Sequence, residues 1–280
     1  MKRILMVGDA VNLNMNTVDF ACYLAKLTHS RLSAILIEHL IEEEEPALKD
    51  QESVHFVESI GNPDLPENKN KSSRLEENER LFGMACSNRG VNAQVTRLKE
   101  PSVNSIVEES RYADLLIINA DTSFKDRPEG SPSQFVKEIL AETECAVILA
   151  PYSFFGVDEI LLTYDGSKSS VFAIKQFAYL FPELKDKKVN LIQIDEEKLA
   201  DSSETEKIRD LLKLHFSNFE IQRIMGKPAD ELFGYLLGRK NLFVVMGAYG
   251  RTLMSNLFRP SAASLVVKAI NLPLFIAHYQ

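Results

Sequence analysis

The 280-residue chain is acidic, with 40 Asp and Glu residues against 32 Lys and Arg residues and a net charge of −8. This balance, with no basic block, disfavours nucleic acid and anionic membrane surfaces as partners. Hydrophobic residues make up 45% of the chain, but no apolar run approaches the roughly 18 residues that cross a bilayer. The composition therefore predicts a globular protein of one large domain or two ordinary ones.

Apolar runs of strand length alternate with helical patterns along the first half of the chain. We expect strands, in order, at 2–9, 31–39, 91–99, 113–120 and 145–151. The helical patterns between them cover 14–30, 73–89, 101–112 and 132–142. The short apolar run near the N-terminus is interpreted as a first buried strand, because it is too short for the core of a signal peptide.

The same cycle then restarts, since "DEILLTYDG" resembles "KRILMVGDA" and Asp165 matches Asp9. Expected strands lie at 158–166, 188–194, 219–225, 241–248 and 273–278, and expected helices at 169–181, 203–217, 228–239 and 261–270. The repeat predicts two tandem domains, 1–151 and 157–280. An insertion at 40–72 of the first domain is polar and acidic, and we interpret it as a solvated loop.

The strand-like runs lack the alternation of strands that face water on one side, which favours strands buried on both faces of a parallel sheet. Strands separated by helices imply right-handed crossovers and a doubly wound α/β layer. We therefore expect each domain to hold a five-stranded parallel sheet, and we take its strand order to be 3-2-1-4-5. A ligand would bind between strands 1 and 4, where the strand order reverses.

Polar residues and glycines converge on that point in the second domain. Asp165 ends the expected first strand, and Gly247 and Gly250 follow the fourth. Glycines let a backbone approach a phosphate, and the N-terminus of the following helix favours an anion. A purely structural interpretation also fits, in which the glycines turn the chain and Asp165 caps the next helix.

At this point the sequence resembles the universal stress protein family, whose nucleotide-binding members carry G-2x-G-9x-G-S/T after strand 4. Gly247, Gly250, Pro260 and Ser261 match that spacing. The resemblance implies an adenine-nucleotide alpha-hydrolase-like fold and an ATP site in the second domain only. The residues it implies for that site are Asp165, Ile194, Met246, Gly247, Gly250, Ser261 and Ala262. No metal is implied beyond Mg²⁺ carried by the nucleotide.

The chain departs from the family pattern in both halves. Pro260 replaces the third glycine, so one candidate N–H donor is lost and we expect phosphate binding to be weakened. In the first domain Asn119 and Thr122 stand where the second has Gly247 and Gly250. Their side chains would crowd a phosphate, so we expect no ATP there. We expect the first domain instead to pack against the second as an intrachain pseudo-dimer, around the C-terminal strands of both. Whether two chains also form a homodimer is left open.

No nucleophile–base pair and no metal-ligand spacing is evident, so no catalytic residue is expected and at most a weak ATPase. Cys22, Cys86 and Cys145 are widely spaced in sequence and predict reduced, buried thiols in a cytoplasmic protein. The expected function is a stress-response sensor or regulatory module that binds an adenine nucleotide and a protein partner of unknown identity. The alternative is an interaction or scaffold protein of the same fold that binds no nucleotide.

Overall fold

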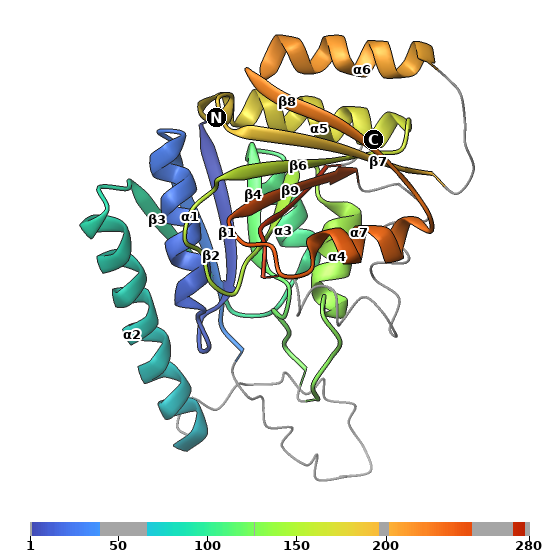
Figure 1. The fold of residues 1–280 in the computed structure, drawn as a ribbon. Coiled ribbons are helices and arrows are strands. Elements are labelled where there is room, and N and C mark those ends of the chain that lie inside the picture. The colour runs from blue at the N-terminus through green and yellow to red at the C-terminus, as the bar shows by residue number, and fades with distance from the viewer. Residues whose placement is uncertain (1, 40–65, 126, 196–201, 248–270, 278–280) are drawn as a thin grey trace.

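The computed structural model describes residues 2–39, 66–125, 127–195, 202–247 and 271–277 of the chain. Their strands form one ten-stranded sheet in the order β3-β2-β1-β4-β5-β10-β9-β6-β7-β8 (Figure 1). In Figure 1 the strands of the first half run upright, whereas those of the second half run across the view, as the twist of a long sheet requires.

The strand order is the same when the sheet is followed inward from either edge. The first half contributes β1 (Arg3–Asp9), β2 (Arg31–Ile37), β3 (Ala93–Leu98), β4 (Leu115–Asn119) and β5 (Ala146–Ala150). The second contributes β6 (Glu159–Tyr164), β7 (Lys188–Asp195), β8 (Asn218–Met225), β9 (Leu242–Gly247) and β10 (Leu274–Ala277). Each half therefore reads 3-2-1-4-5, and the predicted α/β class is confirmed.

The two halves meet through their last strands. β5 and β10 pair antiparallel, with Phe275 opposite Ile148, whereas the other strand pairs are parallel. The sheet is consequently continuous across the middle of the chain. The domain boundaries at 1–151 and 157–280 stay a prediction.

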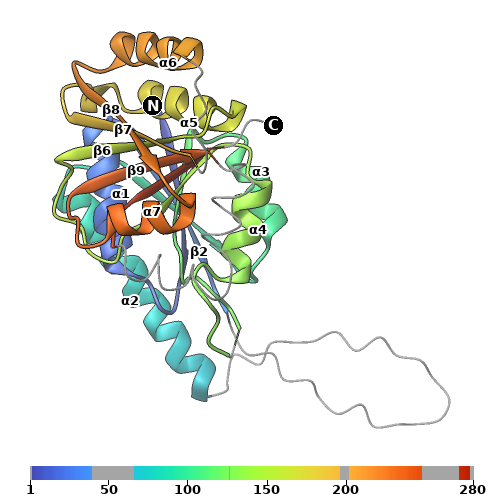
Figure 2. The same cartoon turned by 45° about the vertical axis from the view of Figure 1, so that its right-hand side comes forward.

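Helices cover both faces of the sheet (Figures 1 and 2). One face carries α1 (Met15–Leu27), α2 (Pro66–Asn88), α5 (Lys168–Leu180) and α6 (Ser202–His215), which share one core cluster. The other carries α3 (Val103–Ser110), α4 (Gln134–Glu142) and α7 (Pro228–Leu236), which share a second. A short 3-10 helix, η1 (Pro182–Leu184), follows α5. The core thus lies in two layers, one on each side of the strands.

Helix α2 begins seven residues before the predicted start at residue 73, so the predicted loop at 40–72 is wrong over its last residues. The helical signal was missed because the buried apolar residues of α2 begin only at Leu75 and continue at Phe82 and Cys86. The preceding residues are polar and give no apolar period. Residues 40–65 and the predicted helix 261–270 lie outside the described residues.

The two edge strands alternate in exposure, contrary to the expectation that strands lack alternation. β3 and β8 expose every second side chain along most of their length, whereas β4 and β9 are buried throughout. The physical reason is position, because the partly buried residues of each edge strand pack mainly against the core cluster on one face of the sheet. Residues such as Gln94 and Glu220 therefore face water.

Two cysteines that are far apart in sequence are neighbours in space. Cys22 on α1 and Cys86 on α2 are both buried, and their Sγ atoms lie 3.5 Å apart. All three cysteines are free, and burial raises the pKa of Cys145 to about 12. The thiols of Cys22 and Cys86 therefore contribute apolar packing between α1 and α2.

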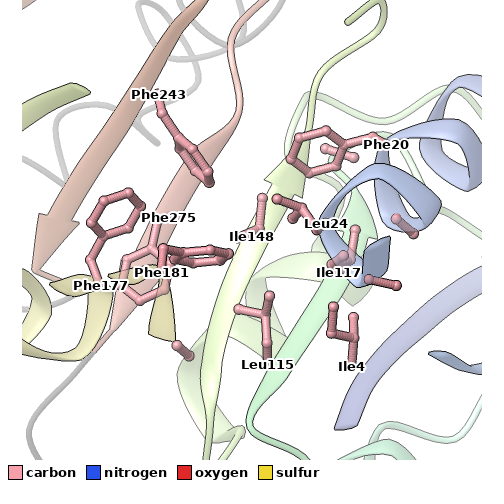
Figure 3. Close-up of a cluster of buried hydrophobic side chains, with 14 of the residues drawn as sticks. Ile4, Phe20, Leu24, Leu115, Ile117, Ile148, Phe177, Phe181, Phe243 and Phe275 are labelled. Atoms are coloured by element: carbon pink, nitrogen blue, oxygen red, sulfur yellow. The ribbon is translucent and has the colours of Figure 1, made fainter. Parts of the chain in front are cut away.

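Aromatic side chains fill the core where the two halves join (Figure 3). Phe177 on α5 stands edge-on to Phe243 of β9 and Phe275 of β10, with ring centroids 5.1 and 5.4 Å apart. Phe243 also lies 6.4 Å from Phe20 on α1 of the first half. This cluster therefore joins a helix of each half to the central strands.

We predict that Phe177→Ala lowers the free energy of unfolding by about 3–5 kcal/mol, because it removes a fully buried ring and leaves a cavity. Phe155→Ala is the matched control, since that ring is 83% exposed and its loss should change stability by less than about 0.5 kcal/mol. Denaturant unfolding measures both. Equal effects of the two substitutions would contradict the assignment of Phe177 to the joint between the halves.

Candidate functional site

The carboxyl ends of β6 and β9 lie side by side in the second half. These strands are parallel, with Leu162 opposite Val245, so Asp165 directly after β6 stands near Gly247 at the end of β9. This is the point where the strand order of the half reverses. The structure thus brings together two of the residues that the sequence singled out.

Asp165 shapes the turn into α5. Its Oδ1 accepts a hydrogen bond of 2.9 Å from the backbone N–H of Ser167, and Ser167 in turn caps α5 through a 3.1 Å bond from the N–H of Ser170. Gly166 between them has φ +74, which a residue without a side chain adopts at no cost. The carboxylate is exposed, and its Oδ2 accepts from no described residue. Asp165 therefore supports the turn with one oxygen, while the other has no partner among the described residues.

Gly247 is required by the close approach of α5. A Cβ at this position would lie 2.6 Å from the carbonyl carbon of Ser169 and 2.7 Å from the backbone nitrogen of Ser170. Real side chains do not tolerate such contacts with a backbone. The first turn of α5 thus packs directly on the end of β9, and this packing alone explains the glycine.

The remaining residues of the predicted site divide into two groups. Ile194 lies in β7 opposite Ile224 of β8, and the side chain of Met246 is 2% exposed in β9, so either could meet a ligand mainly through its backbone. The others lie outside the described residues, namely Gly250, Ser261 and Ala262, together with Pro260.

The equivalent place in the first half holds a cavity of about 300 Å³ between β1 and β4. The register pairs Met6 with Ile117 and Val7 with Ile118 just before Asn119, and it pairs Leu162 with Val245 just before the end of β9 in the other half. Polar side chains from three segments line this cavity, among them Asp9, Asn12, Thr17, Asn119, Asp121 and Tyr152. We call it the first-half cavity.

The segment between β1 and α1 explains the room in the first half. Residues 10–14 separate Asp9 from the start of α1, whereas only residues 166 and 167 separate Asp165 from α5. Asn78 of α2 holds the longer segment, because its amide donates to the carbonyls of Ala10 and Val11 at 2.9 Å. Because this connection is longer, the first turn of α1 is not forced against the end of β4 at Asn119.

Asp9 is already occupied by its own loop. Its Oδ1 accepts from the backbone N–H groups of Val11 and Asn12 at 2.7 and 3.0 Å, and its Oδ2 accepts from the Asn12 amide at 3.0 Å. The carboxylate therefore fixes the turn, but it does not cap the helix as the structural interpretation of the matching Asp165 expected, because the N-caps are Asn14 for α1 and Ser167 for α5. Its charge still faces the cavity.

The loop after β4 is held by internal hydrogen bonds. Asn119 Oδ1 accepts from the N–H of Asp121 at 2.8 Å, and the Ser133 hydroxyl donates to the carbonyl of Thr122. The same hydroxyl caps α4 by accepting from the N–H of Val136 at 3.2 Å. Pro132 therefore precedes the N-cap rather than beginning the helix, and Ser133 uses its hydroxyl within the protein.

Tyr152, from the segment that follows β5, adds a hydroxyl to the cavity rim. It donates to Asp121 Oδ2 at 2.8 Å. Burial and the carboxylate beside it raise the pKa of Tyr152 to about 12, so the phenol stays protonated and donates throughout the neutral range.

Sequence reasoning identified Asp9 and Asn119 as counterparts of Asp165 and Gly247 but missed Thr17, Asp121 and Tyr152. The length of the β1–α1 connection was the available signal, since "AVNLNMN" is longer than "GSK". No sequence pattern pointed to Tyr152 as a site residue, because it lies in the segment assigned to the domain boundary.

The described residues contain no group of three or more His, Cys, Asp or Glu side chains that could hold a metal ion. Within the same residues, no helix has both the length and the apolar character needed to cross a membrane.

No family model and no curated protein matches this sequence. Its structure is similar to a universal stress protein from Archaeoglobus fulgidus, with a TM-score of 0.66 and 15% identity over 99% of this chain and 96% of that one. A candidate universal stress protein from Pseudomonas aeruginosa UCBPP-PA14 gives 0.59 at 15%, over 99% and 93%. A functionally unknown protein from Pseudomonas aeruginosa PAO1 gives 0.58 at 16%, over 99% and 92%. The chain thus has the fold of these proteins along nearly its whole length.

We predict that Gly247→Ala destabilises the protein by about 1–3 kcal/mol, because the new methyl group would overlap the backbone of α5. Gly234→Ala is the matched control. It lies exposed within α7 with nothing near the added methyl group, so it should stabilise the helix by about 0.5–1 kcal/mol. Thermal unfolding compares them, and a neutral Gly247→Ala would show that α5 does not pack on β9 as described.

Proposed function

We propose that the protein is a cytoplasmic stress-response protein that binds ATP or another adenine nucleotide in its second half, as a sensor or regulatory module. The observation that carries the proposal is the position of Asp165 and Gly247 at the reversal point between β6 and β9. Open α/β sheets bind nucleotides at such points. The structural similarity to a universal stress protein over nearly the whole chain supports proposing a function of the kind found with this fold.

In this proposal Asp165 and the strand ends recognise the nucleoside. The Oδ2 atom of Asp165, which has no partner among the described residues, accepts a hydrogen bond from a ribose hydroxyl or a base amine. The backbone of Ile194 and Met246 borders the base.

The phosphates would meet the segment that follows β9. Gly250 allows close backbone approach, and Ser261 and Ala262 offer N–H groups at the start of the expected helix. Pro260 has no N–H, so the site binds phosphate with one donor fewer than the family pattern supplies. We therefore expect affinity to be modest.

The first half binds no nucleotide in this proposal. The side chain of Asn119 stands where Gly247 stands in the second half, and the hydroxyl of Ser133 is already bonded to Thr122 and Val136. Two carboxylates, Asp9 and Asp121, line its cavity and would repel phosphate.

A scaffold protein that binds no nucleotide is the second candidate, and two observations favour it. Packing against α5 accounts for Gly247 without any ligand. Glu204 of α6 also places Oε2 3.2 Å from the position of a Cβ on Gly166, which brings a negative charge to the turn beside Asp165. A nucleotide would have to tolerate that charge or displace the side chain.

Calorimetric titration of the full chain with ATP, ADP and AMP tests the proposal. We predict saturable binding that Asp165→Asn weakens by about tenfold, because the substitution keeps the oxygen that caps the turn and removes the charge that strengthens the hydrogen bond with the nucleoside. Gly250→Val should abolish binding while the thermal midpoint stays within a few degrees.

Asp210→Asn provides the control, since it removes the same charge from an exposed position on α6. Absence of binding at millimolar nucleotide would leave the scaffold candidate standing. Unchanged affinity in both Asp165→Asn and Gly250→Val would place any bound nucleotide elsewhere.

A further inference from the structure

Two residues that line the first-half cavity each carry a buried polar atom that has no partner among the described residues. The two atoms are Thr17 Oγ1 and Asn119 Nδ2, on residues that are only 3% and 7% exposed. Both residues line the cavity. Buried hydrogen-bonding groups without partners are rare in folded proteins and mark places where another molecule supplies the missing bond.

The orientation of the Asn119 amide is fixed by its other end. Because Oδ1 accepts from the N–H of Asp121 at 2.8 Å, the network assigns Nδ2 as the unpaired group, which can only donate. The Thr17 hydroxyl can donate or accept. The missing partner must therefore present at least one acceptor oxygen to Asn119.

The charge of the cavity is negative. Asp9 and Asp121 line it, and none of the described residues that line it is Lys, Arg or His. Both carboxylate oxygens of Asp9 accept hydrogen bonds from its own loop. Asp121 Oδ2 accepts from the Tyr152 hydroxyl, whereas Asp121 Oδ1 has no partner among the described residues. A phosphate or carboxylate would meet repulsion here, and a cation would meet Asp121.

We propose that the first-half cavity binds a small amine that also carries hydroxyl or carbonyl oxygens, and that it excludes phosphorylated molecules. An oxygen of the ligand accepts from Asn119 Nδ2, the Thr17 hydroxyl bonds a second polar group, and the ammonium lies beside Asp121 Oδ1. The cavity, at about 300 Å³, has the size of the smallest ligand pockets. This site is separate from the nucleotide site proposed for the second half.

Ligand-observed NMR on the full chain tests the chemistry with two matched sets of probes. Each set holds an amine, its uncharged analogue and its phosphorylated form: glucosamine, glucose and glucosamine 6-phosphate, then ethanolamine, ethylene glycol and phosphoethanolamine. We expect saturable binding of the amines in the millimolar range, as suits ligands of this size. We expect weaker binding of the uncharged analogues and none of the phosphorylated forms.

Thr17→Val separates binding from folding. Removing an unpaired buried hydroxyl should raise the thermal midpoint of the free protein, while glucosamine binding weakens. Asp121→Asn should weaken glucosamine binding by at least about threefold and reduce the preference for the amine over glucose. Asp210→Asn, far away on α6, should change neither.

The proposal is overturned if neither amine binds at millimolar concentration, or if the phosphorylated probes bind as well as the amines. A lower thermal midpoint for Thr17→Val would show that the hydroxyl already has a partner, which also contradicts it. These outcomes are independent of ATP titration, because Asp165→Asn leaves the first-half cavity intact.

Discussion

The distance at which the first helix of each half packs on the fourth strand is the constraint from which both sites follow. In the second half two residues connect β6 to α5, and the backbone of Ser169 lies so close to β9 that only Gly247 fits. In the first half five residues connect β1 to α1, and Asn119 keeps its side chain beside an open cavity. One fold thus presents two different reversal points.

The antiparallel pairing of β5 with β10 makes these two points parts of one continuous sheet. A single sheet and a shared aromatic core extend from α1 through β9 to α5. Each reversal point lies at the carboxyl ends of two strands of the same half. The two candidate sites therefore share no residue.

The periodicity of the sequence was sufficient for the fold class, since the alternation of strands and helices and the restart at Asp165 predicted two repeated α/β halves. The order of strands within each half was taken from the doubly wound fold and not from the periodicity. The periodicity could not reveal that Gly247 is explained by packing, because that depends on how near α5 lies in space. The sequence pattern also could not predict the cavity, because one wall depends on Tyr152, which bonds Asp121 from a segment 31 residues away. The alternation of β3 and β8 was missed because edge positions depend on the assembled sheet.

A crystal structure of the protein grown with both ATP and glucosamine tests the central claim most directly, namely that the two reversal points have opposite ligand preferences. The account predicts nucleotide density between β6 and β9 beside Asp165, and amine density between β1 and β4 within reach of Thr17, Asn119 and Asp121. Nucleotide density between β1 and β4 would contradict it.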